Sequence, residues 1–158
     1  MINRHEEFMG LAMEEALAGL QQGEQPFGAV VVRDGEVIAR ARSLKVSTFD
    51  VTAHAETLAV GKATRVLKTR TLTGCTFYSV CEPCPMCCGA IINARVSTLV
   101  LGARHANLRS IAAGTLHYRD YSVEKLVELT GAGLKVIGGV MEKECEALYR
   151  NAKVPLSY

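Results

Sequence analysis

Two short segments of the chain carry side chains that can bind a metal ion and move protons. Cys84 and Cys87 are spaced as Cys-x-x-Cys inside the run Val80-Cys81-Glu82-Pro83-Cys84-Pro85-Met86-Cys87-Cys88. Such a pair at a turn or helix start places two sulfurs on one side, close enough to bind one ion. Upstream, His54-Ala55-Glu56 offers an imidazole and a carboxylate. We therefore predict a metal site with three ligands, His54, Cys84 and Cys87.

The fourth position of such a site determines what it can do. Zinc with three protein ligands keeps its fourth tetrahedral position open for water, whereas a fourth side chain would close the site. Bound zinc lowers the pKa of that water from about 15.7 to about 7. Hydrolysis also needs a group that carries protons. The pattern H-x-E with P-C-x-x-C is the signature of zinc deaminases, in which the glutamate is a general acid and base and not a ligand. We therefore predict Glu56 as the catalytic residue.

A helix over 53–68 is expected to position the upstream half of the site. Thr52 is a suitable N-cap for it, and Glu56 in its first turn suits the positive end of the helix dipole. Residues two apart do not share a face of a regular helix. The site therefore requires a bent first turn, or a Glu56 side chain that curls round to the metal that His54 binds.

A second helix is expected over 83–94, with Pro83 at its first position and Cys84 directly behind. Both halves of the site then meet at helix N-termini. The positive ends of the two helix dipoles favour the thiolate forms of Cys84 and Cys87, which are the forms that bind a metal.

The remaining chain alternates between strand-like and helical patterns. In α/β sheets of this kind, ligand sites gather where strands lead into helices. The pattern predicts a mixed five-stranded sheet with helices on both faces. The predicted strands are 27–33, 36–42, 76–80, 98–102 and 133–138, the first two joined by a tight hairpin turn at Asp34-Gly35, and the further helices are 4–20, 122–130 and 142–151. A long connection over 103–120 is left between them.

Size, charge and composition limit the classes of function. The 158 residues, 49% of them hydrophobic, fit a single domain over 1–158 with a sizeable core. The net charge of +2 is too small to indicate nucleic-acid binding. The N-terminus has no signal-peptide pattern and no run reaches the roughly 18 apolar residues of a membrane span. We expect a cytoplasmic protein with reduced thiols and no membrane partner.

The motifs resemble those of a known family. His54-Ala55-Glu56 with Pro83-Cys84-Pro85-Met86-Cys87 is similar to the zinc-dependent cytidine deaminase superfamily, and residues 26–102 resemble its branch of guanine, yeast-type cytosine and tRNA adenosine deaminases. The resemblance implies a three-layer α/β/α fold, one zinc ion per chain, hydrolytic attack on a ring carbon and loss of ammonia, with protons carried by Glu56. It also implies that the Ala55 backbone N–H helps to hold the base and that the protein is a homodimer.

The resemblance leaves the substrate open between two classes. The resemblance to guanine deaminases is strongest at Pro26-Phe27-Gly28-Ala29 and in the run from Cys81 to Cys87. It implies that Tyr158, at the C-terminal end of this chain, folds over the pocket, as terminal segments do in the free-base enzymes. Gly102-Ala103-Arg104 and Ala112-Ala113-Gly114 are more similar to the tRNA enzymes, but the Arg-rich C-terminal end expected there is missing.

One position departs from the branch. Ser43 stands eleven residues before His54, where the branch usually carries an asparagine that hydrogen-bonds the base. A hydroxyl is a shorter arm with fewer hydrogen bonds to offer. We expect a free nucleobase such as guanine, cytosine or isocytosine, contacted by Phe27, Ser43, Ala55 and Tyr158. Adenosine in a tRNA loop is the alternative.

A non-catalytic module is the alternative from another class. Cys81, Cys84, Cys87 and Cys88 could form a structural zinc or iron–sulfur site, although the further Cys-Pro of a ferredoxin-like run is absent after them. That reading leaves the His54 motif without a role. We expect a structural role for Cys81.

Other polar residues have simpler explanations than substrate binding. His105 and His117 lie in the long connection and are expected to face solvent or to bond locally rather than to approach the substrate. Arg65, Lys68 and Arg70 are expected to form a solvated face.

Overall fold

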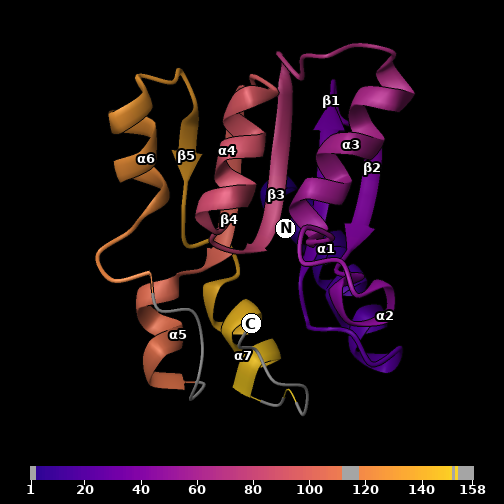
Figure 1. The fold of residues 1–158 in the computed structure, drawn as a ribbon, viewed down its shortest axis with the longest axis vertical. Coiled ribbons are helices and arrows are strands. Elements are labelled where there is room, and N and C mark those ends of the chain that lie inside the picture. Colours follow the sequence, from indigo (N-terminus) through magenta and orange to yellow (C-terminus); the bar gives the residue numbers. More distant parts are fainter. Residues whose placement is uncertain (1–2, 112–117, 151, 153–158) are drawn as a thin grey trace.

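A five-stranded mixed sheet forms the middle layer of the molecule (Figure 1). The computed structural model describes residues 3–111, 118–150 and 152. The strand order is β2-β1-β3-β4-β5, with β1 antiparallel to both of its neighbours and β3, β4 and β5 parallel. The strands are β1 (Gly28–Arg33), β2 (Glu36–Arg42), β3 (Cys75–Cys81), β4 (Thr98–Ala103) and β5 (Lys135–Ile137). The predicted mixed sheet is therefore confirmed.

Helices cover both faces of this sheet, which gives the three layers that the sequence predicts. One face packs against α3 (Ala55–Leu67), α4 (Pro85–Asn93) and α6 (Val123–Thr130), and the other against α1 (Arg4–Gln21), α5 (His105–Ile111) and α7 (Glu142–Arg150). Alternate residues of each strand serve the two cores. Phe77 and Leu99 point to the first core and Tyr78 and Val100 to the second. The central strands are buried on both faces and are accordingly almost continuously apolar.

The hairpin between β1 and β2 forms as predicted. Asp34 and Gly35 have φ values of 52° and 82°. Two successive residues with positive φ are what a type I′ turn requires, and this turn matches the twist of the strands it joins.

Both helices that lead to the predicted metal site begin later than the sequence suggested. The prediction of Thr52 as N-cap is wrong, because His54 is the extended N-cap of α3. The Thr52 hydroxyl instead donates to Asp50 Oδ1 at 2.7 Å. Pro85, and not Pro83, is the first residue of α4, and Cys84 is its N-cap.

Two short helices were not predicted. α2 (Lys45–Thr48) lies between β2 and α3, and α5 occupies part of what was predicted as a long connection. The side chain of Glu24 accepts hydrogen bonds from Val46 N and Ser47 N in α2, both at 2.9 Å. The carboxylate of Glu82 likewise accepts a hydrogen bond from the first backbone N–H of α5. Both helices are thus capped by carboxylates distant in sequence, which local patterns do not reveal.

No helix in the described part of the chain is long and apolar enough to cross a membrane.

Candidate active site

The two predicted motifs meet at the end of β3, where α3 and α4 begin. His54 and Cys84 are both N-cap residues with extended backbones, so each lies outside its helix. The rule that residues two apart diverge on a helix therefore does not apply to His54 and Glu56. No bent first turn is needed, and both side chains reach the same place.

The spacing of the three donor atoms fits a tetrahedral zinc ion. The donor atoms of His54, Cys84 and Cys87 all lie within 4.8 Å of one another. His54 Nδ1 is 3.7 Å from Cys84 Sγ and 3.4 Å from Cys87 Sγ. Zinc–sulfur and zinc–nitrogen bonds of about 2.3 and 2.1 Å at a tetrahedral angle place sulfur and nitrogen roughly 3.6 Å apart. The cluster therefore has the dimensions and the donor set of a three-ligand zinc site.

In the metal-free cluster the expectation of a thiolate holds for Cys84 but not for Cys87. A hydrogen bond between the two thiols lowers the pKa of Cys84 to about 4 and raises that of Cys87. The backbone N–H of Cys87 also donates to Cys84 Sγ at 3.5 Å, which is the hydrogen bond expected for an N-cap side chain. Cys84 is therefore held as a thiolate, and its hydrogen bond raises the pKa of His54.

Glu56 is buried beside the cluster but lies outside the set of metal donors. Its Oε1 accepts a hydrogen bond from Ser79 Oγ at 3.0 Å, and its Oε2 lies 3.5 Å from Cys87 Sγ. Burial raises the pKa of this carboxyl group. A carboxyl group that binds its proton more tightly than usual is suited to pass protons at neutral pH.

Ser79 is a functional candidate that the sequence reasoning missed. It is fully buried in β3, and its hydroxyl contacts both Glu56 and the carbonyl oxygen of Cys81, at 2.7 Å. A polar residue in the middle of an apolar strand was the available signal, because buried hydroxyls need partners.

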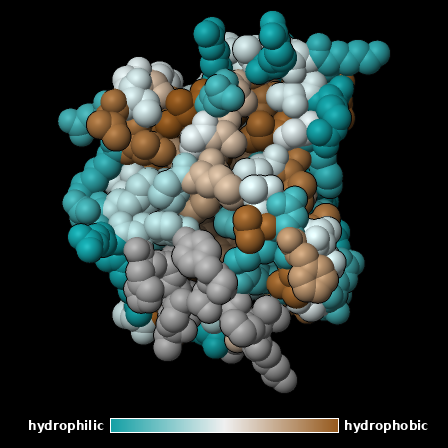
Figure 2. Space-filling model, viewed as in Figure 1, coloured by the Kyte–Doolittle hydropathy of each residue, from teal (hydrophilic) through white to brown (hydrophobic). Residues whose placement is uncertain are grey.

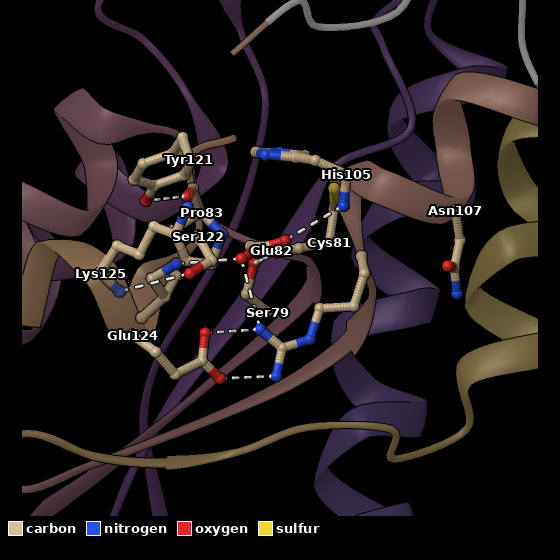
Figure 3. A network of polar contacts seen from close by, with 12 residues as sticks. Ser79, Cys81, Glu82, Pro83, His105, Asn107, Tyr121, Ser122, Glu124 and Lys125 are labelled. Carbon is tan, nitrogen blue, oxygen red and sulfur yellow. Dashed lines mark hydrogen bonds and ion pairs between the residues drawn. The ribbon is translucent and has the colours of Figure 1, made fainter. Parts of the chain in front are cut away.

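A buried carboxylate supports the metal-binding loop from behind (Figure 3). Glu82 accepts hydrogen bonds from His105 N at 3.1 Å and Val123 N at 3.0 Å, and Arg104 Nη1 lies 3.3 Å from the same carboxylate. Tyr121 adds a bond from its hydroxyl to the carbonyl oxygen just before Cys84, at 2.7 Å. The loop that carries Cys84 is thus tied to the first residues of α5 and α6. The sequence reasoning did not identify this network.

The comparison with known families decides which kind of site this is. Residues 2–103 match the family model of the cytidine and deoxycytidylate deaminase zinc-binding region. The chain belongs to this family. The ion that this deaminase binds is zinc, and when bound it supplies an activated water at neutral pH.

Relatives of this deaminase carry the names of enzymes with different substrates. A tRNA-specific adenosine deaminase of Bacillus subtilis is 38% identical over 144 residues, which cover 91% of this chain and 85% of that protein. A guanine deaminase of the same organism is 43% identical over 104 residues, 65% of this chain and 67% of that protein. The solved structure of guanine deaminase from Nitrosomonas europaea superimposes with a TM-score of 0.79 at 28% identity, covering 93% of this chain and 83% of that one.

Backbone hydrogen bonds connect three of the four predicted substrate contacts to the segment that carries His54. Ser43 is buried, and its backbone N–H donates to the carbonyl oxygen of Phe27 at 3.2 Å. The next residue bonds to the carbonyl oxygen of Ala53, so this segment adjoins the one that carries His54. Ala55 is the buried first residue of α3. Tyr158 lies outside the described residues, and the roles of all four stay predictions.

Phe27 packs against a second aromatic residue. Its ring packs against the ring of Tyr149 on α7, with 5.4 Å between centroids. Tyr149 is buried behind it, and its hydroxyl faces the thiol of Cys81.

The structure distinguishes the cysteines. Among the described residues, the group that could hold a metal contains neither Cys81 nor Cys88. Both are buried, and burial raises the pKa of each thiol. The four-cysteine module is therefore not the arrangement that the fold brings together.

The expectation that His105 faces solvent is wrong. Its ring is 1% exposed, and its Nδ1 has no hydrogen-bond partner, so it neither faces solvent nor bonds locally through that atom. The pairing of β3 with β4 brings His105 beside Tyr121, and this packing cannot be read from the connection alone. His117 lies outside the described residues.

Proposed function

We propose that this deaminase removes the exocyclic amino group of a free nucleobase or a close heterocyclic relative, such as guanine, cytosine or isocytosine. The observation that carries the proposal is the position of Glu56. This carboxyl group is buried beside the His54, Cys84 and Cys87 donors, is held by Ser79, and is not itself a donor to the metal. A structural metal site has no use for such a group.

The chemistry that follows is an addition of water and a loss of ammonia. The ring carbon keeps the oxygen of water as a carbonyl, and its bond to the amino group breaks. One proton of water goes to the neighbouring ring nitrogen and the other to the leaving amine. Glu56 carries both protons in turn and ends in the state in which it began. Ser79 holds the carboxylate in place, and the Ala55 N–H and Ser43 hydroxyl would orient the ring.

The charges around the site favour a small neutral substrate. Arg42, next to Ser43, pairs with the carboxylate of Glu15 at 2.9 Å. Arg104, next to the His105 end of the site, pairs with Glu124 at 2.7 Å and with Glu82. Cations that are already paired contribute little to binding phosphates, on which affinity for RNA depends.

Three further cations lie far from the metal cluster, whereas Lys45 is close enough to His54 to act on it electrostatically. Arg65, Lys68 and Arg70 border a groove of about 830 Å³ between the C-terminal ends of α3 and α4. Hydrophilic side chains project from this end of the molecule in Figure 2. The metal cluster is at the N-terminal ends of the same two helices, on the order of 20 Å away at 1.5 Å per residue of α3. A small substrate held at that groove would not reach Glu56.

Deamination of adenosine in a tRNA loop is the second candidate. It is favoured by the similarity to the Bacillus subtilis tRNA-specific adenosine deaminase, which extends over 91% of this chain. Such a substrate needs room for unstacked nucleotides and contacts to phosphates near the site.

A panel of substrates separates the two candidates. Ammonia release is measured with guanine, cytosine, isocytosine, adenine, their nucleosides and an anticodon-loop RNA hairpin, with Glu56→Ala as the inactive control. We expect the highest kcat/KM with a free base. A higher kcat/KM with the hairpin, together with hairpin binding that persists at about 150 mM salt, would overturn the proposal.

A further inference from the structure

The Nδ1 atom of His105 is an unusual feature of this molecule. Only two buried side-chain nitrogen or oxygen atoms of the described residues have no hydrogen-bond partner, and the other one, the Tyr149 hydroxyl, faces the thiol of Cys81. An unpaired buried polar atom costs about 1–3 kcal/mol. The neighbouring carboxylate of Glu82 is engaged with the backbone N–H groups of His105 and Val123 and with Arg104. An unpaired atom at such a place indicates a partner that binds from outside.

The strand register places this ring beside the metal-binding loop. Cys81 of β3 pairs with Ala103 of β4 in a parallel ladder, and Glu82 N donates to the carbonyl oxygen of Ala103 at 2.7 Å. Pro83 and His105 are each two residues beyond the paired positions, so they lie at the same height at the same end of the sheet. Cys84 follows directly, and its charge is close enough to act on the His105 ring.

Aromatic rings surround the imidazole. The His105 ring lies 5.3 Å from the ring of Tyr118 and 6.0 Å from that of Tyr121 between centroids. Figure 3 shows the imidazole reaching from the start of α5 toward Tyr121, whose hydroxyl bonds to Pro83. A few polar atoms set among aromatic rings are typical of sites that bind planar ligands.

Burial also keeps this ring uncharged. Desolvation lowers the pKa of His105, so the imidazole is neutral at pH 7. A neutral imidazole has one nitrogen that donates and one that accepts, and the tautomer adapts to its partner. This chemistry suits the edge of a neutral heterocycle, which presents donors and acceptors side by side.

We propose that His105 is a specificity-determining residue, whose Nδ1 forms a hydrogen bond with the edge of the bound heterocycle on the side that faces the start of α5. This inference rests on the proposed function, because it needs a heterocycle in the site. It also supplies a contact beyond the one available to Ser43, whose hydroxyl is short and offers fewer hydrogen bonds than an asparagine amide.

The test replaces the ring nitrogens and keeps the shape. His105→Phe preserves a planar ring among the tyrosines and removes the unpaired atom. We expect it to keep one zinc per chain and to lose no thermal stability. On the best substrate of the panel, kcat/KM should fall by roughly ten- to a hundredfold, the loss of one hydrogen bond to a buried group. His105→Asn, which keeps a polar atom near the position of Nδ1, should restore part of it.

A second histidine provides the matched control. His5 Nδ1 is already bonded to the hydroxyl of Tyr78, at 2.9 Å, on the opposite face of the sheet. His5→Phe should therefore lower thermal stability and leave the preference among substrates unchanged. This is the reverse of the pattern expected for His105→Phe.

The decisive readout is the ratio of kcat/KM values for two substrates, because this ratio does not depend on the fraction of folded enzyme. An unchanged ratio in His105→Phe would overturn the inference even if the variant is partly unfolded. A wild type that prefers the RNA hairpin would overturn the proposed function alone, and the ratio in the variant would still decide the role of His105. A wild type that deaminates no member of the panel would overturn both.

Discussion

Removing the carboxylate of Glu82 should destabilise the protein far more than removing an acidic residue from its surface. This side chain is 3% exposed and receives two backbone N–H groups, from His105 and Val123, and the guanidinium of Arg104. Glu82→Ala leaves the two backbone N–H groups without their acceptor, whereas Arg104 keeps its pair with Glu124. At about 1–3 kcal/mol for each of the two buried donors, we expect a loss of roughly 2–6 kcal/mol in the free energy of unfolding.

Glu124→Ala is the matched control, because it removes a second carboxylate from the same arginine. Glu124 is 49% exposed, and its pair with Arg104 is open to solvent. Exposed pairs contribute about 0.2–1 kcal/mol. Glu82→Gln keeps one acceptor oxygen, and we expect its loss to fall between those of the two alanine variants.

Urea unfolding at a fixed zinc concentration measures the three variants, because bound metal adds to the measured stability. Zinc content is determined in parallel, since Glu82 precedes the loop of Cys84. Equal losses for Glu82→Ala and Glu124→Ala would refute the reasoning. They would mean that water replaces the carboxylate and that the N-termini of α5 and α6 do not depend on it.

Three further predictions concern the metal and its neighbour. Glu56→Ala should keep about one zinc ion per chain and abolish ammonia release, as checked by elemental analysis and an ammonia assay; retained turnover would remove Glu56 from the mechanism. Cys84→Ala or His54→Ala should lose the metal, and part of the stability with it, because metal binding and folding share free energy; zinc retained at one ion per chain would show that other residues bind it. Glu56→Gln should stabilise the metal-free protein at neutral pH. Burial raises the pKa of Glu56 above its ordinary value of 4.5, so the folded wild type loses stability as the pH rises through and above that value. The gain should therefore vanish below about pH 4 and grow with pH in thermal unfolding; a gain independent of pH would indicate another cause.

Periodicity and short motifs were sufficient for the layers and for the metal cluster. Half-exposed strands alternate between apolar and polar residues, and fully buried strands are almost continuously apolar. The positive-φ turn at Asp34-Gly35 is specified by two adjacent residues. His54, Cys84 and Cys87 could be paired from sequence because each motif sits at the start of a helix, and such starts gather at one end of an α/β sheet.

The start of α3 was harder to predict because two residues compete for the cap. Thr52 has the better capping side chain, but both its hydroxyl and its backbone N–H donate to Asp50 Oδ1, the N–H at 2.8 Å. The chain therefore turns before it becomes helical, and His54 is left extended at the N-cap. This two-residue difference is what allows His54 and Glu56 to converge.

The features that sequence did not reveal share one physical origin. Ser79 contacts a residue 23 positions away, and Glu82 contacts residues 23 and 41 positions away. Each is a buried polar group satisfied across strands or helices, so its partner depends on register and not on local pattern. The unpaired Nδ1 of His105 belongs to the same class, since β3 and β4 must first be aligned before its surroundings exist. Substrate choice depends on such groups, because a site with buried hydrogen-bonding atoms rejects ligands that leave them unpaired. The motifs are therefore sufficient to indicate a deaminase. The register of β3 and β4 is needed to suggest which substrate it selects.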